Sequence, residues 1–142
     1  MSDLYSLLWP VISRIDPDTA HGLAIAALKR GLVPGCRSAP DSRLQQRLWG
    51  LDFANPVGLA AGFDKNAEVA VAMLGQGFGF VEIGPVTPKA QPGNPKPRLF
   101  RLARDRAVIN RLGFNGGGHA AALANLPLRE TRAGPVGVNL GK

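Results

Sequence analysis

The sequence predicts an α/β fold with parallel strands, preceded by two short helices that form a unit of their own. The helices are indicated by apolar residues at helical spacing that come before any strand-like segment. The parallel strands are indicated by residues 57–84, where a strand, a helix and a strand have the spacing of a right-handed βαβ unit. A further strand-like run over residues 136–140 is expected to extend the sheet.

Composition narrows the class of protein before any motif is considered. The chain has 142 residues, 45% of them hydrophobic, which is enough for the core of one ordinary domain. Its formal net charge of +7 favours anionic partners. The charges are scattered and only 6% of residues are aromatic, so we expect no nucleic-acid partner. Cys36 is the single cysteine, which indicates a reducing compartment. We also expect no metal site, no signal peptide and no membrane-spanning helix.

The two N-terminal helices are predicted from apolar periodicity and from their caps. Residues 3–15 have one apolar face, which Pro10 interrupts with an expected kink. The second helix is expected to begin with Asp16 as N-cap and Pro17 in the first turn, and to run to about Arg30, before Gly31.

The apolar face of the first helix includes Tyr5 and Trp9, which favour the boundary between water and lipid. The alternative is that both helices cover the core of the following domain. We therefore divide the chain into a helical unit over 1–35, a linker over 36–47 and the α/β domain over 48–142. A short strand or hairpin broken at Gly50 is expected to open that domain over 48–53.

The stretch from Asn55 to Asn66 is where we expect chemistry. An apolar run, Val57–Ala61, reads as a buried strand whose C-terminal end enters a site. Gly and Ala leave the backbone bare, so a flat ligand can lie against the main chain, and Lys65 adds a positive charge. The alternative is a tightly packed core strand with a solvated turn.

The remaining elements follow in order. A helix is expected over 66–75, a strand over Phe80–Gly84, and then a proline-rich loop to Arg98 at the position where ligand loops sit. Residues 99–102 and 107–110 predict an antiparallel hairpin, and 119–126 a short helix. Val136–Leu140 is expected to be a third buried strand. Three parallel strands cannot close a barrel, so we expect the chain to stop in the middle of its fold.

Several segments match one protein family in order and spacing, over essentially all of the chain. They are Asp16–His21, Asn55–Lys65, Val81–Arg101, Ile109–Asn115 and Gly137–Lys142. In these motifs the chain resembles the N-terminal part of the class 2, quinone-dependent dihydroorotate dehydrogenases. The resemblance implies an incomplete (β/α)8 TIM barrel with about its first three strands, preceded by the two-helix unit.

The resemblance also implies the ligands and their residues. The flavin cofactor FMN would contact Ala61, Gly62, Phe63, Asp64, Lys65, Pro85 and Asn139. Dihydroorotate would contact Lys65 and the substrate segment, Asn110, Arg111, Leu112, Gly113 and Phe114. Asn110 suits the lactam edge of a pyrimidine, and Asn115 is expected to help. The alternative for each Asn is a turn-forming or capping residue.

Pro85 departs from the family pattern. The family has Ser or Thr at this FMN-contacting position, and proline offers neither a hydroxyl nor an N–H. Thr87 or the Pro85 carbonyl would therefore have to supply the contact.

The implied reaction is oxidation of (S)-dihydroorotate to orotate in de novo pyrimidine (UMP) biosynthesis. FMN accepts the hydride, and a quinone reoxidises it. The base of this class is a serine expected beyond Lys142, so we expect no catalytic base within these residues and no turnover by this chain alone. The two helices would form a quinone tunnel near His21 and Arg101, peripheral on the cytoplasmic face of a bacterial cell membrane. The alternative function is a non-catalytic membrane-binding or interaction module.

Overall fold

The computed structural model of the chain describes residues 3–36, 41–126 and 134–142, without the side chains of residues 3–6. The predictions for the side chain of Tyr5 and for part of the linker, 37–40, therefore lie outside the described residues.

The two N-terminal helices form as predicted. α1 spans Asp3–Ile12 with Pro10 inside it, and α2 spans Pro17–Lys29. The Asp16 carboxylate caps α2 by accepting hydrogen bonds from the backbone N–H and the hydroxyl of Thr19, both at 2.9 Å. α2 ends before Gly31, whose φ of +68° lies in the left-handed region.

The parallel sheet has three strands in the order β3–β4–β7, which confirms the predicted βαβ arrangement. β4 spans Phe80–Val86 and β7 spans Val136–Leu140. The strand predicted over Val57–Ala61 is shorter than expected: β3 comprises only Gly58–Leu59 and is partly buried. The prediction that Val136–Leu140 is buried was wrong, because β7 is an edge strand and residues 137–140 are exposed.

The helix predicted over 66–75 is also shorter. α3 spans only Ala70–Leu74. Ala67 has a φ of +59°, which a helix does not allow, and the N–H groups of Glu68 and Val69 bond the Asp64 carboxylate. The side chain of Asp64 thus holds residues 64–69 in a turn, and the helix begins after it.

Both predicted hairpins are present. β1 (Gln46–Leu48) pairs with β2 (Leu51–Phe53) after a 3-10 turn, η1 (Ser42–Leu44). β5 (Leu99–Leu102) pairs with β6 (Ala107–Asn110). The last helix, α4, spans Gly118–Asn125.

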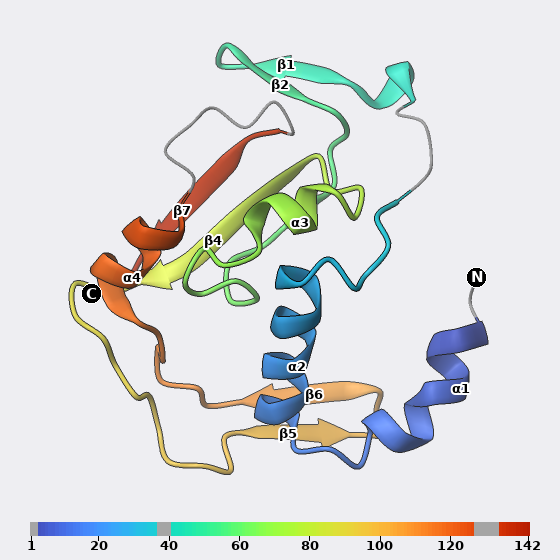
Figure 1. The fold of residues 1–142 in the computed structure, drawn as a ribbon, viewed down its shortest axis with the longest axis vertical. Helices are drawn as coiled ribbons and strands as arrows, with labels where there is room; N and C mark the ends of the chain where they lie inside the picture. Colours follow the sequence, from blue (N-terminus) through green and yellow to red (C-terminus); the bar gives the residue numbers. More distant parts are fainter. Residues whose placement is uncertain (1–2, 37–40, 127–133) are drawn as a thin grey trace.

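The core lies between the sheet and its helices. Val81 and Ile83 of β4 are almost fully buried and pack with α3, whereas the alternate residues Phe80 and Glu82 belong to the opposite face of the strand. Figure 1 shows α2 between this sheet and the β5–β6 hairpin, and α2 contacts both α3 and β5. The two-helix unit therefore rests on the α/β part at two places.

Candidate functional site

The carboxyl ends of β3 and β4 meet through backbone hydrogen bonds. The Gly62 N–H donates to the Gly84 carbonyl at 2.7 Å, and the Gly84 N–H donates to the Asp64 carbonyl at 2.9 Å. Gly62 has a φ of +111°, and apart from Gly62 and its two chain neighbours no atom of the described residues lies within 4 Å of the place where its Cβ would be. The structure thus leaves open space against the bare backbone of Gly62.

A cavity of about 580 Å³ opens beside this backbone, between α2 and residues 63–68. It brings together five of the predicted residues: His21, Phe63, Asp64, Lys65 and Asn115. The His21 and Phe63 rings meet edge to face, with centroids 5.2 Å apart. The other lining residues are Gly22, Ile25, Ala26, Lys29, Arg30, Asn66, Glu68 and Gly116.

Two basic groups in the cavity wall, Lys65 and His21, prefer their neutral forms more than usual. Burial lowers the pKa of the Lys65 ammonium, and nearby Arg98 adds to this, while Asp18 opposes it. Burial likewise lowers the pKa of His21 below its usual 6.5, and the charge of Lys65 adds to it. An anionic ligand beside Lys65 would favour the charged form of its ammonium group.

Two asparagines join the cavity wall to the loop before α4. The Asn66 side-chain oxygen accepts a hydrogen bond from the Gly117 N–H at 2.8 Å. Asn115 has a buried side-chain oxygen with no hydrogen-bond partner among the residues that the structure describes. An unpaired buried acceptor is costly, so this oxygen suits a ligand with an N–H group. Asn66 was missed as a lining residue, since nothing in its sequence context distinguishes it from a turn residue.

The substrate segment, Asn110–Phe114, is not part of the cavity wall. It is held instead by the proline-rich loop. The N–H of Asn94 donates to the Leu112 carbonyl at 3.0 Å, and its side-chain amide donates to the Arg111 carbonyl at 2.7 Å. Gly113 and Phe114 both have positive φ, and the Phe114 side chain is 57% exposed.

Pro85 and Asn139 lie on neighbouring strands, apart from the cavity wall. The Asn139 side-chain amide donates to the Glu82 carboxylate at 3.0 Å, so Glu82 orients it. Thr87, offered as a substitute for the missing hydroxyl at Pro85, is buried and donates to the Lys89 carbonyl at 2.6 Å. Its hydroxyl is therefore already engaged.

Arg101 connects the β5–β6 hairpin to the two-helix unit. Its guanidinium donates to the carbonyls of Ser13 and Ile15, at 3.2 Å and 2.7 Å, in the connection between α1 and α2. The structure therefore places Arg101 against the helical unit, but not in the wall of the cavity that His21 lines.

Comparison with known proteins bears directly on these observations. Residues 43–142 match the family model described as dihydroorotate dehydrogenase. The chain belongs to this family. It is 65% identical over 128 residues to a dihydroorotate dehydrogenase (quinone) from Rhizobium rhizogenes, covering 89% of this chain and 35% of that protein. It is 60% identical over 141 residues to the Mesorhizobium japonicum protein of the same description, and this match covers 99% of this chain and 39% of that protein.

Solved structures of the family agree with the fold. The chain superposes on the dihydroorotate dehydrogenase of Eimeria tenella in complex with ferulenol with a TM-score of 0.82 and 46% identity, over 89% of this chain and 36% of that one. The chain thus spans between a third and two-fifths of its relatives' length. The resemblance to quinone-dependent dihydroorotate dehydrogenases is confirmed, with a parallel sheet that does not close into a barrel over the described residues.

Over 3–36, 41–126 and 134–142, no helix has the length and apolar character needed to cross a bilayer. In the same ranges, no group of three or more His, Cys, Asp or Glu side chains is arranged to hold a metal ion.

Proposed function

We propose that these residues are the N-terminal portion of an enzyme that oxidises dihydroorotate to orotate and passes the electrons to a quinone. The observation that carries the proposal is the site at the end of β3, where the open backbone of Gly62 lies near Lys65, a partly buried cation. The relatives that match over this region bear the same activity in their descriptions.

The residues at this site suit FMN. The open space at Gly62 accepts a planar ring, and Asn139, oriented by Glu82, supplies a polar group from the neighbouring strand. Ala61, Gly62, Phe63, Asp64 and Lys65 would hold the cofactor, with Pro85 lining the site. FMN, when bound, supplies the hydride acceptor.

The chain's own groups would bind and orient the substrate. Lys65 would pair with the carboxylate of dihydroorotate, because its ammonium group is partly desolvated and an anion offsets that cost. The side-chain amide of Asn110 would bond the lactam edge of the ring, with the rest of the substrate segment around it. Together these contacts fix the ring in one orientation, which is the main contribution of binding residues to catalysis.

The test is to express the complete reading frame that contains these residues and to assay the purified protein with FMN. The expected result is reduction of a quinone that depends on dihydroorotate, together with a bound-flavin absorbance spectrum. The 142-residue chain is expected to give no turnover. A complete protein that binds flavin but does not oxidise dihydroorotate would refute the proposed reaction.

We further propose that the two-helix unit lies on an anionic membrane surface, on the cytoplasmic face of the cell membrane, and admits the quinone near His21 and Arg101. The apolar side chains of α1 support this, because Leu7, Val11 and Trp9 are exposed, at 74%, 61% and 40%. An exposed apolar helix beside basic residues is typical of interfacial binding. The net charge of +7 adds attraction to acidic lipids.

Vesicle binding tests this second part. The complete protein is expected to co-sediment with vesicles containing anionic lipid, and deletion of residues 1–35 is expected to abolish it. The double variant Leu7→Glu and Val11→Glu should weaken vesicle binding strongly. Leu123→Glu, at another exposed apolar position, 53% exposed on α4, is the control and should have little effect. Equal loss in both variants would contradict an interface made by α1.

A further inference from the structure

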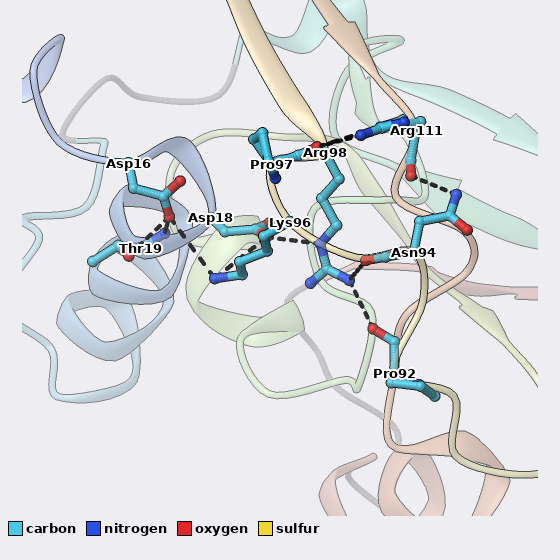
Figure 2. Close-up of polar contacts among 9 residues, drawn as sticks. All are labelled: Asp16, Asp18, Thr19, Pro92, Asn94, Lys96, Pro97, Arg98 and Arg111. Carbon is cyan, nitrogen blue, oxygen red and sulfur yellow. Dashed lines mark hydrogen bonds and ion pairs between the residues drawn. The ribbon is translucent and has the colours of Figure 1, made fainter.

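An ion-pair network joins the first turn of α2 to the proline-rich loop, across 80 positions of sequence. The Arg98 Nε donates to an Asp18 carboxylate oxygen at 2.7 Å. Both side chains are largely buried, with exposed fractions of 10% and 12%. Lys96, whose side chain is 57% exposed, adds longer pairs to Asp16 at 3.8 Å and to Asp18 at 3.5 Å. Figure 2 shows these groups converging at the start of the helix.

Arg98 also organises the loop on which it lies. Its second guanidinium nitrogen, Nη1, donates to the carbonyls of Pro92 and Asn94, at 2.7 Å and 3.2 Å. These two carbonyls belong to residues two positions apart in the loop, and the Arg98 side chain bonds both of them (Figure 2). A guanidinium offers several donors in a fixed plane, which lysine cannot reproduce.

The same loop holds the substrate segment. The Arg98 carbonyl accepts the N–H of Arg111 at 2.9 Å, and the Pro97 carbonyl accepts the Arg111 guanidinium at 3.0 Å. Asn94, whose carbonyl Arg98 bonds, donates to the carbonyls of Arg111 and Leu112. Hydrogen bonds therefore run without a break from Asp18 on α2 to residues 111–112, although α2 does not itself hold that segment.

The charges of Asp18 and Arg98 also affect the pKa of Lys65 in the cavity wall. Their charges oppose each other there, since Asp18 raises the pKa of Lys65 and Arg98 lowers it. The charge of Asp18 also acts on His21, whose other charged neighbours are Lys65 and Asp64. The pair thus lies near the cation proposed to bind substrate as well as beside the helical unit.

We infer that Asp18 and Arg98 are positioning residues that tie the two-helix unit to the substrate segment, so that each holds the other in its working geometry. The inference rests on the proposed function for its kinetic consequences. The pair touches neither ligand in the proposed arrangement and acts through Asn94 and Arg111. Its physical basis is that removing Asp18 leaves the largely buried Arg98 charge without a carboxylate, whereas removing Arg98 leaves the largely buried Asp18 with only the longer pair to Lys96. In either case the local structure must rearrange.

The test is a double-mutant cycle in the complete enzyme, with Asp18→Asn, Arg98→Met and both together. Each single change is expected to raise the KM for dihydroorotate about tenfold, with a smaller effect on kcat. The double variant should resemble the single variants instead of showing the roughly hundredfold rise that independent effects would give. Arg98→Lys should recover only part of the affinity. Lys96→Met, which removes only the longer pairs of an exposed ammonium group and keeps the Asp18–Arg98 pair, is the matched control and should stay close to wild type.

Hydrogen exchange tests the network without any activity. In Arg98→Met and in Asp18→Asn, amides of residues 110–114 and of the first turn of α2 should both exchange faster, whereas Lys96→Met should leave them unchanged. A wild-type protein that fails to oxidise dihydroorotate would refute the proposed function but leave this readout intact. Faster exchange confined to α2 in Asp18→Asn, or additive effects on KM, would overturn the inference.

Discussion

The side chain of Asp64 offers the sharpest test of how this site is built. It is 1% exposed, and its two oxygens accept the N–H groups of Glu68 and Val69, each at 2.8 Å. A hydrogen bond to a charged acceptor contributes about 1.5–3 kcal/mol, and two are lost in Asp64→Ala, which gives roughly 3–6 kcal/mol. Asp64→Asn keeps one acceptor oxygen and should lose about half of that. The turn that places Lys65 depends on this carboxylate.

The assay is urea denaturation of the complete protein, followed by far-UV circular dichroism, with hydrogen exchange at the two amides as a local readout. Asp52→Ala is the control, because its side chain is 76% exposed and its ion pair with Arg47, at 3.5 Å, should contribute less than about 1 kcal/mol. Asp64→Ala within about 1 kcal/mol of wild type would refute the reasoning, since two buried amides would then be unpaired without cost.

Three further predictions concern the strands, the cavity and the substrate. Gly84→Ala should destabilise the protein by at least about 1–3 kcal/mol, because φ is +106° and the new Cβ would lie 2.6 Å from the Asn139 carbonyl oxygen. Gly22→Ala is the control: it has open space around the new Cβ and should be neutral or stabilising. Thermal unfolding of both variants measures the difference. Because the pKa of His21 is lowered on folding, the unfolded chain binds a proton more readily than the folded chain. The contribution of neutral His21 to the free energy of unfolding is therefore present above pH 6.5 and lost below it. His21→Gln should flatten this part of a plot of the free energy of unfolding against pH. Lys65→Met should raise the KM for dihydroorotate by about 10–100-fold in steady-state kinetics, through loss of a charge-assisted hydrogen bond.

Local patterns predicted those elements whose formation depends on neighbouring residues. Asp16 followed by Pro17 is a capping signal that acts within one turn, so α2 begins where the sequence indicates. The β5–β6 hairpin likewise depends on a short connection. The helix expected over 66–75 failed for a physical reason: Asp64 bonds the amides that a helix would leave free at its start, and this delays α3 to Ala70.

Burial and contacts between distant segments could not be predicted in the same way. Val136–Leu140 has the composition of a core strand, but composition does not say whether another element covers it, and here it lies at the edge of the sheet. The site residues divide similarly. The motif at 61–65 predicted bare backbone next to a cation, whereas the closeness of His21 to Phe63 depends on how α2 docks.

The sequence alone determined the family, the order of the elements and the residues expected to bind flavin and substrate, because motifs and caps act over short stretches of chain. The tertiary structure alone decided which of those residues share a cavity and what supports them. Asp18 and Arg98 are each ordinary charged residues in the sequence, and only folding brings their charges to 2.7 Å with little access to water. That burial makes the pair depend strongly on both partners, which is why its role appears in the structure and not in the sequence.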